Sequence, residues 1–449
     1  MSADRVSAVG GTRSVPAPDT IARDYIVLAL RLDQHVPGLV DGYFGPAMLK
    51  AQVDLEQLRS PARLRDDAAA LHRTVLESVA EPDRRGWLAA QLTALEAQAA
   101  TLANDAGDEA GDGAGGDRSS SSPGYVDYVA QCFDRAPARR DEAIFDAAAA
   151  SVDALVPGSG PLADRLAAWD AQFTIDPDRL PAIVDWLVAR FRARSRALFG
   201  LPDGEAVDVS LVRDRPWSGY NWYGGGGRSR VDLNLDLPIR AADLVHTIVH
   251  ETYPGHHLEH AWKEAALVEE AGRLESSILL INTPECLISE GLAEVGHAFA
   301  SPPDQEASLL AELYERAGLA IALDGAARES AQIDAALGAP RRILGAARTN
   351  AALLRHADGA SPDEVLAYLR RVGRFAEERA AKAVAFLDHP LWRTYGFVYD
   401  AGRELLDRWL ADGPPDRRAG RFGRLLREQL TPSGVAAEIA APDATATSP

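Results

Sequence analysis

The chain has 449 residues, of which 47% are hydrophobic, so it is long enough to bury a substantial apolar core. Its formal net charge of -19 argues against two classes of partner, because nucleic acids and anionic membranes bind through basic surfaces. The two cysteines, Cys132 and Cys286, exclude a disulfide framework and a cysteine zinc ribbon. We therefore expect a globular protein without a nucleic-acid or membrane partner.

The first 200 residues are expected to be helical. Residues 1–20 lack the apolar stretch of a signal peptide, so we expect a disordered lead and a cytoplasmic protein. Apolar residues then recur at helical spacing through 21–200, which predicts an N-terminal helical lobe. Within this lobe, residues 103–124 are acidic and rich in Gly and Ser, so they are predicted to form a flexible loop.

The pattern changes after residue 200. The segments AVDVSLV (206–212) and SRVDLNLDL (229–237) alternate polar with apolar or β-branched residues, which predicts a small sheet or hairpin. Helical patterning runs from Ala241 almost to Leu430. Its predicted interruptions lie near 283–284, 301–303, 338–340 and 388–390. We expect 201–436 to form a second, catalytic lobe and 437–449 to be a disordered tail.

Five of the ten histidines lie between residues 246 and 260, in the sequence HTIVHETYPGHHLEH. Imidazole and carboxylate groups are natural zinc ligands, and a catalytic zinc site has three protein ligands and one open position. Glu251 follows His250 directly, as the general base follows the first ligand in helical His-Glu-x-x-His motifs. The segment therefore predicts a catalytic metal site that begins with His250 and Glu251.

Spacing alone leaves the second histidine ligand open. On a regular helix His257 would return to the face of His250 about two turns away, whereas His256 would be closer but rotated off that face. Either choice requires an irregular helix. Pro254 and Gly255 can provide it, because proline removes a helical hydrogen bond and glycine tolerates unusual dihedral angles.

A third ligand is expected from a separate helix. The segment ISEGLAEVGHAF (288–299) places Glu290 and Glu294 four residues apart, on one helical face. Glu290 is the predicted ligand. Glu294, Glu259 and His297 are candidates to orient the ligand imidazoles, because metal-bound histidines usually need such partners.

Four segments together resemble the bacterial family called domain of unknown function 885. They are LRLDQHVPGLVDGYFGP (30–46), HETYPGHHLEH (250–260), SEGLAE (289–294) and YDAGRELL (399–406). The family is similar to thermolysin-like and thimet-oligopeptidase-like zinc peptidases, in which the second histidine ligand follows a glycine. The resemblance implies a mainly α, multi-helix zincin. It also implies that His250, His256 and Glu290 bind zinc and that Glu251 is the general base.

Two further segments are expected to contact a peptide substrate. The strand segment before the metal helix corresponds to an edge strand that pairs with extended peptides in related zinc peptidases, and Tyr223 and Asn234 are the predicted substrate-binding residues near it. Near the C-terminus, Tyr395, Tyr399 and Arg403 follow one another at four-residue steps. We expect Tyr399 to stabilise an oxyanion, Arg403 to bind a substrate carboxylate, and Tyr395 to lie in the core.

These features favour a zinc-dependent metallopeptidase that acts on short peptides. One alternative is a non-haem iron oxygenase, because two histidines and a carboxylate also bind iron, although that chemistry has no need of Glu251. The other alternative is a non-catalytic helical binding protein with a relic metal site.

Overall fold

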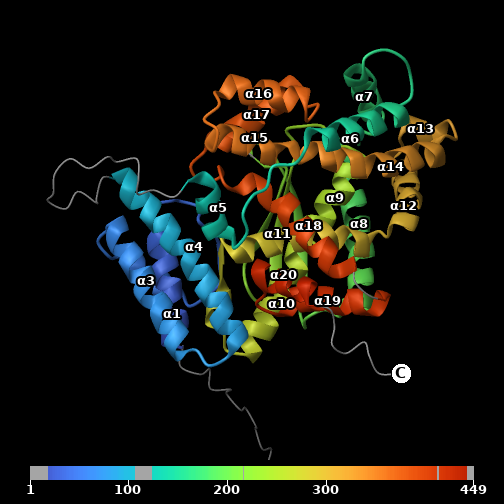
Figure 1. Cartoon of the computed structure of the whole chain (residues 1–449). Helices are drawn as coiled ribbons and strands as arrows, with labels where there is room; N and C mark the ends of the chain where they lie inside the picture. Colours follow the sequence, from blue (N-terminus) through green and yellow to red (C-terminus); the bar gives the residue numbers. More distant parts are fainter. Residues whose placement is uncertain (1–18, 107–123, 216, 412–413, 442–449) are drawn as a thin grey trace, which may run out of the picture.

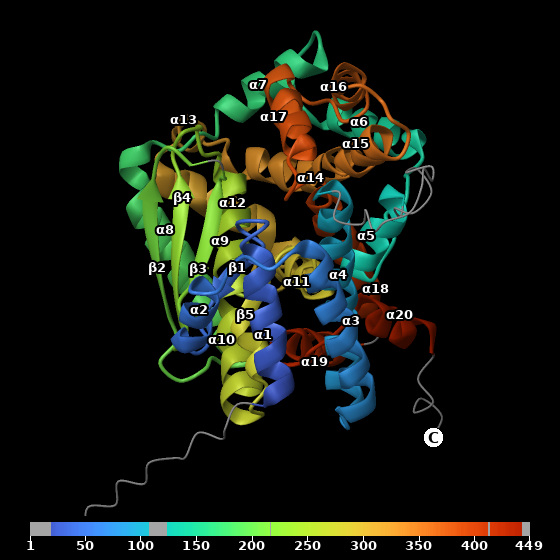
Figure 2. The same cartoon turned by 90° about the vertical axis from the view of Figure 1, so that its left-hand side faces the viewer.

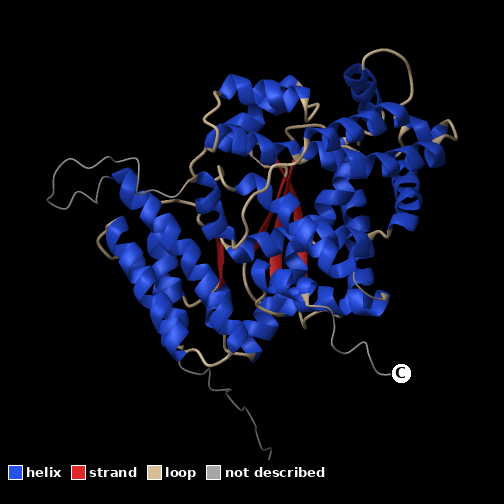
Figure 3. Cartoon of the chain, in the orientation of Figure 1, coloured by secondary structure: helices blue, strands red, loops and turns tan. Residues whose placement is uncertain are grey.

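Helices form most of the structure, a computed structural model that describes residues 19–106, 124–215, 217–411 and 414–441 (Figures 1 and 3). The prediction of a mainly helical fold with small sheets is confirmed for these residues. Most of the predicted lead, acidic loop and tail lies outside them. Residues 103–106 and 437–440, predicted to be loop and tail, are helical instead. Ala103 is fully buried, and the Glu438 carboxylate accepts hydrogen bonds from Trp409 and Arg424.

Three of the first helices, α1 (Thr20–Asp33), α3 (Pro61–Ser78) and α4 (Pro82–Ala106), pack side by side at one edge of the molecule (Figure 1). The short α2 (Ala47–Asp54) packs against α1. The carboxylate of Asp19 accepts a main-chain N–H in the first turn of α1 and so caps that helix. α4 is bonded to a later segment of the chain, because Gln98 Nε2 donates to the carbonyl oxygen of Asn282 at 3.0 Å.

The next helices lie on the other side of the predicted acidic loop. They are α5 (Tyr125–Phe133), α6 (Glu142–Leu155), α7 (Leu162–Ala171), a short 3-10 turn (Pro177–Arg179) and α8 (Leu180–Phe199). α6 packs against α14 (Ala327–Gly345), and α8 packs against α9 (Ala241–Glu251). Helices from the predicted N-terminal lobe therefore contact helices of the predicted second lobe.

A three-stranded sheet contains β2 (Ala206–Val212), β3 (Gly219–Tyr223) and β4 (Arg228–Asn234) in the order β2-β4-β3 (Figure 2). The strands predicted at 206–212 and from 229 are present, but they pair in parallel. The hairpin is formed by β3 and β4, whose connection includes Gly225–Gly227, all at positive φ. The prediction that the strand before the metal segment is an edge strand is wrong, because β4 pairs with a strand on each side. β3 is an edge strand instead, and it contacts α9 (Ala241–Glu251) and α10 (His256–Lys263). A second sheet pairs β1 (Val40–Tyr43) with β5 (Ile278–Leu280).

The histidine-rich segment 246–260 forms two helices separated by a break. α9 (Ala241–Glu251) ends at a break of four residues that contains Pro254 and Gly255, and α10 (His256–Lys263) begins directly after it. The predicted irregularity is therefore confirmed. The chain continues through a π-helical turn (Glu264–Glu270) and a 3-10 turn (Leu274–Ser277) to α11 (Pro284–Ala300).

The remaining chain is helical. Its elements are α12 (Pro303–Ala317), α13 (Ala320–Leu323), α14 (Ala327–Gly345), α15 (Ala347–His356), α16 (Pro362–Arg371), α17 (Glu377–Asp388), a 3-10 turn (Tyr395–Phe397), α18 (Val398–Ala411), α19 (Pro415–Arg427) and α20 (Pro432–Ala440). The interruption predicted at 338–340 is wrong, because α14 continues through Pro340. The packing of α14 on α6 and α12 offsets the loss of the helical hydrogen bond that proline removes. None of the described helices combines the length and apolar character needed to cross a membrane.

α11 lies near the centre of the fold and packs closely on α18 (Figure 1). Gly291 and Gly402 permit this approach, because a Cβ atom on Gly291 would lie only 2.7 Å from the carbonyl carbon of Gly402. The buried apolar residues form one cluster that extends from Tyr25 to Val435, so the two predicted lobes share a core. The close contact places the acidic face of α11 beside the first turns of α18.

Candidate metal centre

Three side chains from three helices converge on one point. His250 lies near the end of α9, His256 is the first residue of α10, and Glu290 lies in the second turn of α11. His250 Nε2 lies 3.1 Å from His256 Nε2 and 3.3 Å from Glu290 Oε2, and His256 Nε2 lies 3.6 Å from Glu290 Oε1. Ligands of a tetrahedral zinc ion with bonds of about 2.0–2.1 Å are about 3.3 Å apart. This ligand cluster (His250, His256 and Glu290) is therefore positioned to hold one metal ion.

Unsatisfied atoms in the ligand cluster also fit a cation. Glu290 Oε2 is buried and has no hydrogen-bond partner among the described residues, although it lies 3.3 Å from His250 Nε2. An unsatisfied buried acceptor costs about 1–3 kcal/mol, and more when it is charged. Burial opposes ionisation of Glu290, but the imidazoles of His256 and His250 outweigh burial and hold the carboxyl pKa well below its usual range. A divalent cation would satisfy this ionised oxygen.

The break between α9 and α10 brings the two histidines together. A Cβ atom on Gly255 would lie 1.9 Å from the carbonyl oxygen of His250, so only glycine fits where the chain folds back. The Gly255 N–H donates to the carbonyl oxygen of Val249 at 3.1 Å, which fixes this turn. His257 is fully buried on another side, with its ring nitrogens 2.9 Å from Ser229 Oγ and 3.0 Å from Glu205 Oε2. His256, and not His257, therefore belongs to the ligand cluster.

Hydrogen-bonding groups fix the orientation of His256. The Ser289 hydroxyl donates to Glu259 Oε2 at 2.6 Å, which leaves the Ser289 oxygen, 3.2 Å away, to accept from His256 Nδ1. Glu259 Oε2 itself lies 3.6 Å from His256 Nδ1, and Lys263 Nζ donates to Glu259 Oε1 at 2.7 Å. With Nδ1 engaged as a donor, Nε2 is free to bind a metal.

Glu294 is placed beside His250. Its Oε1 lies 3.6 Å from His250 Nδ1 and 3.3 Å from His246 Nε2, and its other oxygen accepts from Arg403 Nη1 at 3.3 Å. The structure thus places Glu294 and Glu259 next to the ligand imidazoles, where the sequence predicted orienting groups. His297 was the third candidate for orienting a ligand imidazole. Its Nε2 instead lies 3.6 Å from Glu306 Oε1.

Tyr395 is a member of the site that sequence reasoning assigned to the core. It is buried as expected, but its hydroxyl donates to Glu290 Oε1 at 2.6 Å and so orients a predicted ligand. The hydroxyl of a buried tyrosine usually has a hydrogen-bond partner. The sequence therefore indicated that Tyr395 would have such a partner, but not which residue it would be. The identity of that partner depends on the packing of α11 on α18.

Glu251 forms the wall of the site next to strand β3. It is the last residue of α9, and its carboxylate forms no hydrogen bond or ion pair with another described side chain. Burial raises the pKa of this carboxyl, while His250 and His256 oppose the shift. Gly219, the first residue of β3, packs closely against α9 here, since a Cβ atom there would lie 2.6 Å from Thr247 Cγ2 and 3.3 Å from Glu251 Cγ.

Tyr399 and Arg403 differ in availability. The Tyr399 ring centre lies 6.2 Å from that of His250, the residue is 37% exposed, and its hydroxyl has no hydrogen-bond partner among the described residues. Arg403 is paired with Glu294 at 3.3 Å and with Asp407 at 3.2 Å. The structure therefore leaves Tyr399 free to donate to a ligand, whereas the Arg403 guanidinium is already neutralised by the protein.

The two predicted substrate-binding residues form bonds within their own sheet region. Asn234 Nδ2 donates to the carbonyl oxygens of Arg215 and Trp217, at 2.8 and 3.0 Å, and so fixes the loop before β3. The buried Tyr223 hydroxyl donates to Glu264 and accepts the Gly227 N–H at 3.2 Å. The structure does not bring either side chain to the ligand cluster.

Asp41, on β1, is a further acidic group near the cluster that sequence reasoning missed. Tyr220 of β3 donates its hydroxyl to this carboxylate. Burial raises the Asp41 pKa to about 6, and the group is close enough to His256 and Glu290 to interact with both. No local pattern marks Asp41, because its neighbours come from strands and helices far along the chain.

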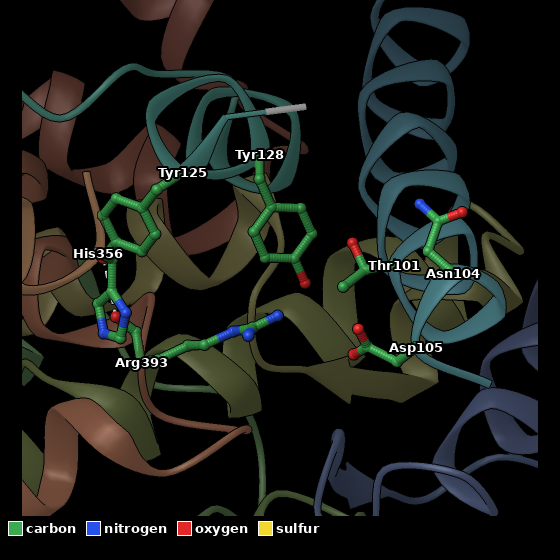
Figure 4. Close-up of a pocket in the computed structure, with 7 residues that line it drawn as sticks. All are labelled: Thr101, Asn104, Asp105, Tyr125, Tyr128, His356 and Arg393. Atoms are coloured by element: carbon green, nitrogen blue, oxygen red, sulfur yellow. Dashed lines mark hydrogen bonds between the residues drawn. The ribbon is translucent and has the colours of Figure 1, made fainter. Parts of the chain in front are cut away.

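A separate pocket lies between α4 and α5 (Figure 4). It is lined by Thr101, Asn104, Asp105, Tyr125, Tyr128, His356 and Arg393. None of the predicted site residues lines this pocket, so it is distinct from the ligand cluster.

No family model and no curated protein matches the chain. Among solved structures, the chain is similar to the crystal structure of a protein from Colwellia psychrerythraea that is described as a "putative lipoprotein". The two are 14% identical, with a TM-score of 0.46, and the match covers 95% of this chain and 77% of that one.

Proposed function

We propose that the protein is a zinc-dependent metallopeptidase that hydrolyses short peptides, with a zincin-like fold related to the domain of unknown function 885 family. The observation that carries this proposal is the convergence of His250, His256 and Glu290 to within 3.1–3.6 Å of one another, beside the free carboxylate of Glu251. A zinc ion held there supplies Lewis acidity, which lowers the pKa of water and polarises a carbonyl group.

The chain's own residues then have separate tasks. Glu251 accepts the proton of the attacking water and delivers it to the leaving amine. Burial raises its pKa above the usual carboxyl range, which makes this carboxylate a stronger proton acceptor. The unbonded hydroxyl of Tyr399 donates to the carbonyl oxygen as negative charge develops there. The edge strand β3 offers main-chain groups to an extended peptide next to Glu251.

The variant Glu251→Gln tests this assignment. Because glutamine cannot accept the proton, we expect the zinc-loaded variant to bind one zinc ion and to lose peptide hydrolysis by about 100-fold or more. Hydrolysis is measured by mass spectrometry of a mixed-peptide digest, with and without chelator. Glu270→Gln, at an exposed position after α10, is the matched control and should keep full activity. Wild-type rates in Glu251→Gln would refute the proposed role.

The same set of ligands is compatible with a non-haem iron oxygenase. The free carboxylate of Glu251 favours hydrolysis, because it supplies a base that oxygen activation does not require. Metal analysis of protein purified without added metal separates the two functions. Stoichiometric iron together with oxygen consumption would contradict the zinc peptidase.

A further inference from the structure

Three arginines of the described C-terminal helices have no partner for their charge. Arg342 (α14), Arg348 (α15) and Arg379 (α17) form no hydrogen bond or ion pair with another described residue. Desolvation by the surrounding protein lowers the pKa of all three, and that of Arg348 falls to about 10. Arg342 and Arg379 are exposed and Arg348 is half-buried, so these three unpaired guanidinium groups are open to a ligand.

Two of these guanidinium groups contact the same ring. The Cζ atoms of Arg348 and Arg379 each lie 5.0 Å from the ring centre of Phe375, which is buried. Contact with a ring orients a guanidinium but does not neutralise it. Arg379 is the charged neighbour that lowers the pKa of Arg348 most. The protein thus holds two like charges near each other without a carboxylate within 4 Å.

Arg348 faces the first turn of α18, which borders the ligand cluster. It interacts electrostatically with Tyr399 and Asp400, and α15 packs against the turn that contains Tyr395. Tyr399 in turn lies beside the ring of His250, at 6.2 Å between ring centres. Both views show α15 and α17 next to each other in the upper part of the molecule (Figures 1 and 2). Tyr399 is therefore a neighbour that Arg348 shares with the ligand His250.

We propose that Arg348, with Arg379 beside it, binds the terminal carboxylate of a peptide substrate, so that cleavage occurs close to a free carboxyl terminus. This substrate class rests on the proposed peptidase function. A guanidinium pairs with a carboxylate through two parallel hydrogen bonds, and a residue of extended peptide spans about 3.3–3.6 Å. A carboxylate shortly after the cleaved bond can thus reach past Tyr399 to Arg348. Arg403, the residue that the sequence suggested for this task, is occupied by Glu294 and Asp407.

Three matched peptides test whether Arg348 binds a carboxylate. They also test whether that carboxylate is the chain terminus or a side chain. One has a free carboxyl terminus, one is amidated, and one is amidated but carries a glutamate side chain at the last position. The zinc-loaded wild type should hydrolyse the free acid with a kcat/KM at least about tenfold above that of the plain amide, mainly through KM. Arg348→Ala should remove this preference and Arg348→Lys should retain part of it. Arg370→Ala, at an exposed arginine of α16, should leave it unchanged.

Calorimetry of the same peptides with zinc-loaded Glu251→Gln gives a readout that does not depend on turnover. Tighter binding of the free acid than of both amides, lost in the additional Arg348→Ala variant, supports the proposal. Equal binding of all three peptides, or a preference that survives both Arg348→Ala and Arg348→Gln in folded protein, overturns it. Equal binding of the free acid and the glutamate amide overturns terminal recognition.

Different results would contradict carboxylate binding by Arg348 and peptide hydrolysis by the enzyme. If wild type hydrolyses the free acid and the amide equally, the carboxylate proposal fails and the peptidase remains. If zinc-loaded wild type hydrolyses no peptide, the proposed function fails, while calorimetry still decides whether Arg348 binds a carboxylate.

Discussion

The Nε2 atoms of His250 and His256 lie 3.1 Å apart, with their rings nearly perpendicular at 88°. Two neutral imidazoles in this arrangement share at most one proton between them, so a cation satisfies both nitrogens better than either ring satisfies the other. The arrangement depends on the turn at Gly255, which places the first residue of α10 back beside the last turn of α9.

Adjacent histidines should respond differently to substitution. We expect His256→Ala to lower zinc affinity by more than about 100-fold, because it removes a ligand and not merely an outer partner. His257→Ala should lower stability by about 1–3 kcal/mol, since it leaves Glu205 and Ser229 without their buried partner, but should keep one zinc per folded chain. Zinc content after dialysis checks this, and the reverse pattern would show that the ligand is misassigned.

Substitutions at two tyrosines should have different effects, one on metal binding and the other on turnover. Tyr395→Phe removes the hydrogen bond to Glu290 and should weaken zinc affinity by about 10–100-fold. Tyr399→Phe should leave zinc affinity unchanged and lower kcat by about 10²–10³-fold, because its hydroxyl is free in the structure. Zinc titration and steady-state kinetics on both variants provide the measurement. Equal effects of the two substitutions on zinc affinity would argue against these roles.

Gly255 should tolerate no side chain. Gly255→Ala brings Cβ to 1.9 Å from a carbonyl oxygen, so we expect a loss of more than about 3 kcal/mol in the free energy of unfolding, with loss of zinc. Gly86→Ala in α4 is the matched control: a Cβ there meets nothing within 4 Å, and alanine favours helix by up to about 1 kcal/mol. Denaturant unfolding measures both, and comparable stability would contradict the tight turn.

Asp400 should make stability depend on pH. Burial raises its pKa from 3.8 to about 6, although Arg140, Arg348 and Arg403 oppose the shift and Glu294 adds to it. Between about pH 4 and 6 the folded state therefore binds more protons than the unfolded state, so this group's contribution to stability falls as pH rises. Asp400→Asn should gain stability relative to wild type at pH 7 but not at pH 4. A difference in melting temperature that is independent of pH would contradict this.

Local sequence features predicted the helical class, the strands at 206–212 and from 229, and the break at Pro254–Gly255. They did so because hydrophobic spacing and proline or glycine act on a few neighbouring residues. The clustering of histidines and the spacing of the glutamates indicated His250 and Glu290 as candidate ligands, whereas the choice of His256 over His257 came from the family resemblance. Contacts between distant elements were not accessible.

Pairing across elements explains what the sequence did not reveal. The bond between Tyr395 and Glu290 exists because Gly291 lets α18 approach α11. The same approach pairs Arg403 with Glu294, which occupies a guanidinium that four-residue spacing suggested for substrate. Spacing shows which face of a helix a residue occupies, but the partner on the opposing helix depends on tertiary packing.

Anomalous diffraction from crystals of the zinc-loaded protein, recorded on both sides of the zinc absorption edge, tests the metal assignment most directly. We predict a single strong peak within about 2.0–2.2 Å of His250 Nε2, His256 Nε2 and one Glu290 oxygen. A zinc peak at another group, such as His246 with Glu294, or no peak between the three ligand atoms, would contradict it.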